Sequence, residues 1–192
     1  EGSSIAIMLS NAVLEKTAEK LGLQVEFRSG SWWGSIAREA YKNLLAECGI
    51  KVEDRERPYF SSVVFPGEKV VSLHLKKVSD SEYHLFDKQG QLLAHGVVGH
   101  PLVCPNFQLT ADRLPSAEEG EVLLHPIQTT TAALRKKLTV KQAREDKNLL
   151  LIRCRDSDRR WCATLVNTLM SMYEKYLIEE NKLVVGAQLS YL

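Results

Sequence analysis

The sequence predicts an α+β fold: a mainly antiparallel sheet, a meander over about residues 59–103, packed by N-terminal helices and a long C-terminal helix. Three observations lead to this class. Helical periodicity occupies both ends of the chain, alternating apolar and polar residues fill the middle, and the two patterns do not alternate in a βαβ rhythm. The 192 residues, 44% of them hydrophobic, suit one domain over 1–192, with a candidate subdivision at the proline-rich stretch 99–126.

Two helices are expected before the sheet. The first covers residues 5–21, with a serine cap before it and Gly22 as its stop. The second begins after Ser31, which can cap it, and ends at Gly49. A short strand over residues 23–27 should connect them. The second helix has apolar residues every three or four positions, on one face: Trp33, Ile36, Ala37, Ala40, Tyr41, Leu44, Leu45 and Cys48.

The middle of the chain predicts four strands: residues 59–65, 70–78, 83–87 and 91–98. Between the last two, Lys88, Gln89 and Gly90 suit a three-residue hairpin loop with a left-handed glycine. In that register His84 and His95 point to opposite faces, because side chains alternate along a strand. A two-residue turn would instead place these histidines opposite each other.

The chain after the meander begins with a predicted loop and ends with helices and short strands. Four of the six prolines fall within 99–126, so this stretch should be mostly loop around short strands such as 121–124. Five further elements are predicted: a helix from about Thr129, a polar helical stretch over 140–147, a strand over 148–154, a helix over about 157–178 and a short strand near 183–189.

The meander also contains the side chains best suited to chemistry. His95, His100 and Cys104 form an H-x4-H-x3-C pattern of residue types that bind zinc. The spacing matches no standard structural zinc site, and another ligand would have to come from a neighbouring strand. Solvated histidines and a buried cysteine are therefore the simpler interpretation. The three residues remain the candidate site of a metal-dependent or thiol hydrolase.

No complete catalytic signature is present. The sequence has neither a G-x-S-x-G elbow nor a glycine-rich phosphate loop. His100-Pro101 and Asp112 match part of the H-x-H-P signature of the JAMM metalloproteases, but Val98 stands where the first histidine is required. We therefore assign no catalytic residue and no cofactor, and the balance favours a protein that is not an enzyme.

Charge is distributed unevenly, although the net charge is +1. Residues 135–160 carry ten basic and four acidic side chains, a local net charge of +6. Such clusters are typical of contacts with nucleic acid, phosphate or acidic proteins, whereas a solvated surface is the simpler alternative. The candidate binding residues are Arg135, Lys136, Lys137, Arg153, Arg155, Arg159 and Arg160.

Two further features bear on partners and location. Trp32, beside the apolar stripe of its helix, is either an exposed interface residue or a staple at the helix start. No apolar run approaches the about 20 residues of a membrane-spanning helix, so no membrane partner is expected. Separated cysteines favour free thiols in a cytoplasmic protein.

These patterns predict a non-enzymatic binding or adaptor domain within a larger intracellular assembly, with another protein as its partner. Binding of nucleic acid or another polyanion through residues 135–160 is the first alternative. A hydrolase using His95, His100 and Cys104 is the second. Homo-oligomerisation is left open by the sequence.

Overall fold

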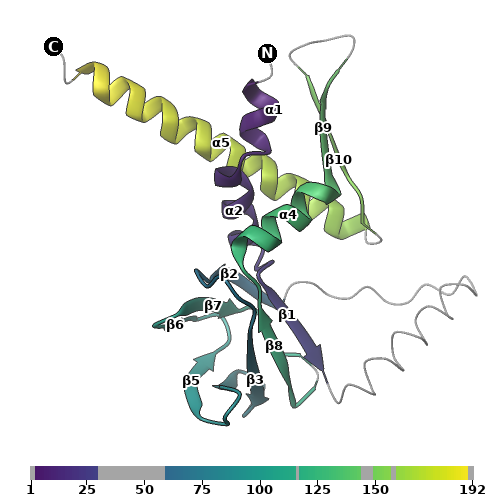
Figure 1. The fold of residues 1–192 in the computed structure, drawn as a ribbon, viewed down its shortest axis with the longest axis vertical. Helices are drawn as coiled ribbons and strands as arrows, with labels where there is room; N and C mark the ends of the chain where they lie inside the picture. The colour runs from purple at the N-terminus through teal and green to yellow at the C-terminus, as the bar shows by residue number, and fades with distance from the viewer. Residues whose placement is uncertain (1–2, 30–58, 116, 144–148, 157–158, 190–192) are drawn as a thin grey trace, which may run out of the picture. The chain divides into compact units, whose positions relative to one another are not determined.

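The computed structural model describes residues 3–29, 59–115, 117–143, 149–156 and 159–189, with side chains up to residue 183. Contacts within the chain divide it into two compact units (Figure 1). The sheet unit comprises residues 21–130, and the helical unit comprises residues 1–20 and 131–192.

The predicted α+β class is confirmed: antiparallel sheets dominate, with helices at the N-terminus and a long C-terminal helix. The single domain over 1–192 and its subdivision at 99–126 stay predictions. The helix predicted between Ser31 and Gly49 lies outside the described residues.

In its described residues, the sheet unit contains two antiparallel sheets. The larger sheet has the strand order β1 (Val25–Ser29), β8 (Glu119–Leu124), β3 (Val71–Lys77), β4 (Glu82–Phe86) and β5 (Leu92–Val97). The smaller sheet has the order β2 (Phe60–Val64), β7 (Phe107–Ala111) and β6 (Pro101–Cys104). The prediction of mostly loop over 99–126 missed β6 and β7. Pro101 opens an edge strand and Pro105 lies in the following turn, positions where a proline interrupts no central ladder.

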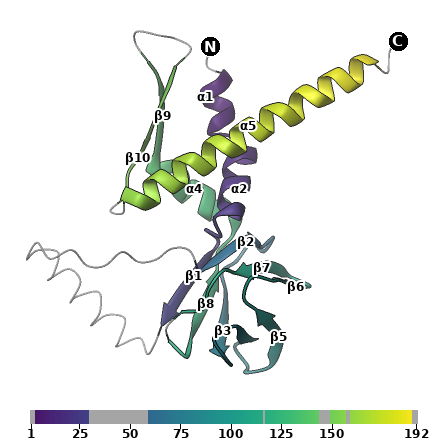
Figure 2. The same cartoon turned by 180° about the vertical axis from the view of Figure 1, so that it is seen from behind.

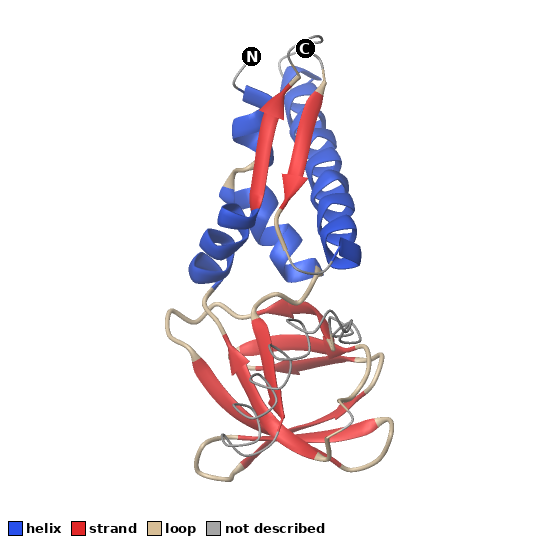
Figure 3. Cartoon of the chain, turned by 90° about the vertical axis from the view of Figure 1, so that its right-hand side faces the viewer, coloured by secondary structure: helices blue, strands red, loops and turns tan. Residues whose placement is uncertain are grey.

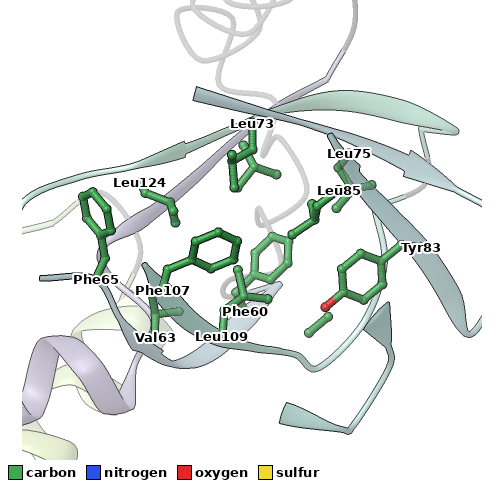
Figure 4. Packing of buried hydrophobic residues seen from close by; sticks show 12 residues of the cluster. Phe60, Val63, Phe65, Leu73, Leu75, Tyr83, Leu85, Phe107, Leu109 and Leu124 are labelled. Atoms are coloured by element: carbon green, nitrogen blue, oxygen red, sulfur yellow. The ribbon is translucent and has the colours of Figure 1, made fainter. Parts of the chain in front are cut away.

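The inner faces of the two sheets share one hydrophobic core (Figure 4). β3 and β4 bury alternate residues, as strands do when one face meets a core. Side chains from or beside the smaller sheet are Phe60, Val63, Phe65, Phe107, Leu109 and Ala111, and those from the larger sheet are Leu73, Leu75, Tyr83, Leu85, Val122 and Leu124. Removal of these apolar surfaces from water is the main force that holds the two sheets together.

A buried glutamine joins three segments at the border of this core. Gln24 is only 2% exposed. Its Nε2 donates to the carbonyl oxygens of Phe65 (2.8 Å) and His125 (3.0 Å), and its Oε1 accepts from the Phe65 amide (3.3 Å). These hydrogen bonds offset the cost of burying the amide group. The side chain therefore fixes the chain before β1 to the ends of β2 and β8.

The helical unit packs short helices and a two-stranded hairpin against a long helix (Figure 3). Its elements are α1 (Ser3–Met8), α2 (Asn11–Lys20), most of α4 (Ile127–Lys137), β9 (Leu138–Gln142), β10 (Leu150–Cys154) and α5 (Arg159–Leu189). α2 packs against α5, and α1 contacts both α5 and β9. Buried residues on α2 and α5 include Val13, Leu14, Ala18, Trp161, Leu165, Leu169 and Met172. None of the described helices combines the length and apolar content needed to cross a lipid bilayer.

The single helix predicted over residues 5–21 is in fact two helices, α1 and α2, which are separated at Leu9 and Ser10. The Ser10 hydroxyl accepts a hydrogen bond from the Val13 amide (3.4 Å), as a cap does at the start of a new helix. The apolar periodicity continues across this break, so periodicity alone could not reveal it.

Two later elements also differ from their predictions. The polar helical stretch predicted over 140–147 is wrong where the structure describes it, because β9 occupies residues 138–142. There Leu138 and Val140 are buried while Thr139 and Lys141 are exposed, the two-residue period of a strand. The short strand predicted near 183–189 is wrong as well, because α5 continues to Leu189.

Candidate interaction surfaces and the histidine pair

Two histidines face each other across the hairpin of β4 and β5. His84 pairs with His95, and their ring centroids lie 5.2 Å apart in an edge-on arrangement. The predicted register, which separated them, is wrong. The three-residue loop is present, since Asp87 N donates to Gln91 O (3.0 Å), but Leu93 is an extra residue in β5. This bulge shifts the pairing by one position and brings the histidines to the same face.

The loop between these strands forms as its sequence predicts. Asp87 Oδ1 accepts hydrogen bonds from the amides of Gln89 (2.9 Å) and Gln91 (2.8 Å). Gly90 has a φ of 80°, the left-handed conformation expected of the glycine in such a loop. The error in the register therefore lies in the strand and not in the turn.

The predicted metal set is only partly brought together. His95 and His100 line one surface hollow, with Gly96 and Pro101 in its wall. Cys104 is not part of this lining, because it packs against the hydrophobic core. Within the described part of the chain, no group of three or more histidine, cysteine, aspartate or glutamate side chains is placed to hold a metal ion.

A buried tyrosine lies on the inner side of β4. Tyr83 is fully buried, and its hydroxyl has no hydrogen-bond partner among the described residues. Its ring lies so close to Gly96 that an added Cβ there would be 2.2 Å from the ring Cζ. Burial and the nearby Cys104 raise the pKa of Tyr83 to about 12, and burial also raises the pKa of the Cys104 thiol. Both groups are therefore protonated at neutral pH, and both side chains pack in or against the hydrophobic core.

The fifth histidine of the chain, just after β8, takes part in a small polar cluster with two residues of β1. His125 Nε2 lies 3.1 Å from Glu26 Oε2, and Arg28 Nε donates to Glu26 Oε1 (2.8 Å). Partial burial raises the pKa of the Glu26 carboxyl, but hydrogen bonds from Arg28 and His125 outweigh it and leave this pKa below its usual value. Glu26 is therefore ionised at neutral pH and holds the side chains of Arg28 and His125 at the β1 edge of the larger sheet.

A second hollow lies over the outer face of the larger sheet. Its charged and titratable lining residues are His74, Lys76, Lys88, Asp87, Glu119 and Glu121. His74 Nε2 lies 3.4 Å from Glu119 Oε2, on a part of the surface where both side chains are about half exposed or more. The lining contains both basic and acidic groups, so its charge favours neither anionic nor cationic ligands.

Arg135 and Lys137, both among the predicted basic residues, make internal contacts in the helical unit. Arg135 donates to the Leu9 carbonyl oxygen (3.1 Å) and to Asn11 Oδ1 (2.7 Å). Lys137 Nζ lies 2.6 Å from Asp156 Oδ2, whose side chain is only 10% exposed. These two cations therefore connect secondary-structure elements. A count of charges along the sequence could not distinguish this structural role from a role in binding.

The other basic residues gather around the β9–β10 hairpin and the start of α5. Strand alternation exposes Lys141 on β9 and Arg153 on β10, and Arg155 is exposed just beyond β10. Leu151 pairs with Lys141 and is 50% exposed. Lys136, Arg159 and Arg160 are exposed as well. The outward face of this hairpin thus combines cationic side chains with an exposed leucine.

The distal part of α5, residues 178–183, exposes two large apolar side chains that sequence reasoning missed. Leu183 is 69% exposed and Ile178 is 53% exposed. Residues 179–182, Glu-Glu-Asn-Lys, contain no glycine or proline and are mostly good helix formers, so a continuing helix could have been predicted there. Trp32, the predicted interface residue, lies outside the described residues.

Comparisons with known proteins identify no family. No protein-family profile matches the chain, and no curated protein matches it. Two crystal structures of FlgL from Xanthomonas campestris, in space groups H3 and C2, align in part at 15% and 14% identity, with TM-scores of 0.26 and 0.25. The alignments cover 68% and 69% of this chain and 43% and 49% of the FlgL chains. The chain thus spans less than half the length of FlgL, and TM-scores this low do not indicate a shared fold.

Proposed function

We propose that this chain is a non-enzymatic binding or adaptor domain within a larger assembly, and that its partner is a helical segment of another protein. The observation that supports this most is the distal part of α5. Leu183 is 69% exposed on a helix whose earlier turns are buried against α2. Apolar residues that extend beyond a helix's own packing partners are typical of helix-in-groove or helix-on-helix recognition.

The spacing of apolar residues on α5 supports a helical partner. Positions 165, 169, 172, 176, 179 and 183 follow the alternating steps of four and three that define a heptad stripe. Leu165, Leu169 and Met172 are buried, and Tyr176 is half-buried. Glu179 interrupts the apolar stripe and pairs with Lys16 of α2 (2.7 Å). Leu183 then resumes the stripe in the exposed part of the helix.

The length of α5 gives this surface room for a partner. The helix has 31 residues and therefore spans about 46 Å at 1.5 Å per residue. Figures 1 and 2 show that α5 continues beyond α1 and α2 within the helical unit. The stripe can therefore pack in the core of the unit at one end and contact a partner at the other.

Site-specific photo-crosslinking in the native cell tests this proposal. A photoreactive residue at position 183 should yield a defined covalent product with a partner protein, whereas one at Lys88, exposed in the β4–β5 loop, should not. The product at position 183 should be lost on excess expression of the unlabelled chain. No product, or the same products from both positions, would refute the assignment of this surface.

A matched pair of variants tests the role of the apolar stripe. Leu183→Glu and Lys182→Glu both place a carboxylate on the exposed helix, but only the first removes a residue of the stripe. We expect Leu183→Glu to weaken co-purification of the crosslinked partner at least tenfold and Lys182→Glu to have little effect. Sedimentation of the purified chain tests whether it associates with itself. A dimer that forms in the wild-type chain and is lost in Leu183→Glu would show that the partner is a second copy.

A second candidate function is polyanion binding by the outward face of the hairpin. Lys141, Arg153 and Arg155 are exposed there together, as nucleic-acid or phosphate contacts require. If this face binds, affinity for single- or double-stranded nucleic acid should fall steeply with salt and be lost in Arg153→Glu/Arg155→Glu. The control Lys76→Glu/Lys88→Glu makes the same change in net charge on the sheet unit. Equal affinity in both double variants would remove this candidate.

The compartment and the hydrolase alternative remain predictions. The structure places Cys104 against the core and outside the hollow lined by His95 and His100, which gives the hydrolase no geometric support. The prediction of a cytoplasmic location depends on cysteines that are well separated in the sequence, whereas Cys154 and Cys162 are in contact in the folded chain. Fractionation of the native cell, followed by detection of this chain, tests the compartment directly.

A further inference from the structure

Two free thiols touch each other in the helical unit. Cys154 ends β10 and Cys162 lies in the first turns of α5, and their Sγ atoms are 3.0 Å apart. This distance is shorter than the about 3.5–4.0 Å optimum for non-bonded heavy atoms and about 1 Å longer than a disulfide bond. Both side chains are half-buried, so the pair lies at the edge of the core rather than deep within it.

Both ends of the pair are fixed by the surrounding structure. Cys154 pairs with Leu138 across the hairpin, and the next residue, Arg155, donates its amide to the Lys137 carbonyl oxygen (2.8 Å). The ion pair between Lys137 and Asp156 holds the chain just after β10. On the other side, Trp161 is buried next to Cys162, and α5 packs against β10. The sulfur contact therefore follows from the packing of a strand on a helix.

We infer that Cys154 and Cys162 form an intramolecular disulfide when the chain meets a low-molecular-weight disulfide such as oxidised glutathione. The product is a covalent link between the β9–β10 hairpin and the start of α5. This inference uses neither the distal part of α5 nor the outward face of the hairpin, so it is independent of the proposed function.

The reaction balances as two successive thiol–disulfide exchanges. One of the two cysteines, as its thiolate, attacks a sulfur of oxidised glutathione and releases one glutathione thiolate, which leaves a mixed disulfide. The other cysteine then loses its proton and attacks the protein sulfur of this mixed disulfide, releasing the second glutathione. The protein gives up two protons and two electrons, and oxidised glutathione becomes two reduced molecules.

The surroundings of Cys154 favour its protonated form. Burial, the hydrogen bond with Cys162 and the nearby Asp156 raise the pKa of the Cys154 thiol to about 12. Cys154 is therefore protonated at neutral pH, and the exchange between the two cysteines benefits from their short sulfur–sulfur distance.

The test uses the unmodified chain. Native protein is incubated with excess oxidised glutathione, free thiols are alkylated, and the chain is cleaved after lysine. The peptide 148–175 then carries Cys154 and Cys162 and neither of the other two cysteines. We expect this peptide without alkyl groups and about 2 Da lighter than its dithiol form, because disulfide formation removes two hydrogens. Two of the four thiols of the chain should be lost in parallel.

Three outcomes would overturn the inference. These are alkylation of both cysteines after oxidation, a stable glutathione adduct on either one, and a cross-link from this peptide to Cys48 or Cys104. Cys162→Ser should abolish the loss of two thiols, whereas Cys104→Ser should retain it. Because the decisive measurement is made on the wild-type chain, a variant that fails to fold does not weaken the test.

Discussion

The sheet unit encloses one cluster of apolar side chains between two sheets, whereas in the helical unit the apolar stripe of the longest helix runs from buried into exposed positions. In the sheet unit, residues such as Leu85 and Leu109 are completely buried, and Gln24 satisfies three backbone groups from inside. In the helical unit, one heptad stripe begins with the fully buried Leu165 and ends with the exposed Leu183. A structural core and a candidate binding surface can therefore belong to a single sequence pattern, and exposure alone separates the two roles.

The largest expected effect comes from comparing two leucines on the same stripe. Leu165→Ala should lower the free energy of unfolding by about 2–5 kcal/mol, because it leaves a cavity at a fully buried position. Leu183→Ala should change it by no more than about 0.5 kcal/mol, since the side chain is mostly in water. Urea unfolding followed by circular dichroism measures both. Similar losses in the two variants would mean that the distal part of α5 is covered within the chain itself.

Gln24 allows the same comparison in the sheet unit. Gln24→Ala should cost about 2–3 kcal/mol, because it leaves the Phe65 amide and two carbonyl oxygens without their partner inside the protein. The matched control is Gln89→Ala in the exposed β4–β5 loop, which we expect to be nearly neutral. Thermal unfolding of the two variants would refute the role of Gln24 if their midpoints were equal.

Tyr83 allows a test of a buried polar group in the sheet core. Tyr83→Phe removes a buried hydroxyl that has no partner among the described residues and keeps the ring that packs over Gly96. Stability should stay the same or rise by up to about 1 kcal/mol, because an unsatisfied polar group is lost without a cavity. A loss of more than about 1 kcal/mol in chemical unfolding would mean that the hydroxyl is hydrogen-bonded after all.

The smallest effect concerns pH and Glu26. Its pKa is lower in the folded chain than in the unfolded chain, so its ionised form stabilises the fold above the usual pKa of 4.5. This contribution is lost as the pH falls through the folded value. Melting temperatures of wild type and Glu26→Gln should therefore differ at pH 6 and converge towards pH 3. A constant difference over this range would show that the carboxylate charge is not involved.

Much of the fold could be predicted because its elements follow local periodicity. Strands such as β3 and β4 were expected within a residue or two of their positions, since alternation is a property of the strand itself. The register of β4 with β5 could not be predicted, because a bulge at Leu93 depends on how the strand fits the rest of the sheet. One extra residue was enough to bring His84 and His95 together.

The candidate site could be predicted only in outline. The charge cluster over 135–160 was visible, but the sequence does not distinguish Arg135, which donates to the Leu9 carbonyl oxygen, from Arg153, which lies on the outward face of the β9–β10 hairpin. The predicted metal ligands lie near each other in the sequence, yet Cys104 packs inward while His95 lines a surface hollow. Side-chain direction depends on the sheet to which each strand belongs, and sequence spacing does not contain that information.

By itself, the sequence determined the α+β class, the presence of helices near both ends of the chain, the β4–β5 loop with its left-handed glycine and the position of the charge cluster. These depend on periodicity, turn chemistry and composition, which act over a few neighbouring residues. Only the tertiary structure decided the histidine pairing, the sulfur contact between Cys154 and Cys162 and the exposure of Leu183. Each of these depends on which distant segment packs against a residue, because burial and contact are properties of the folded chain and not of local sequence.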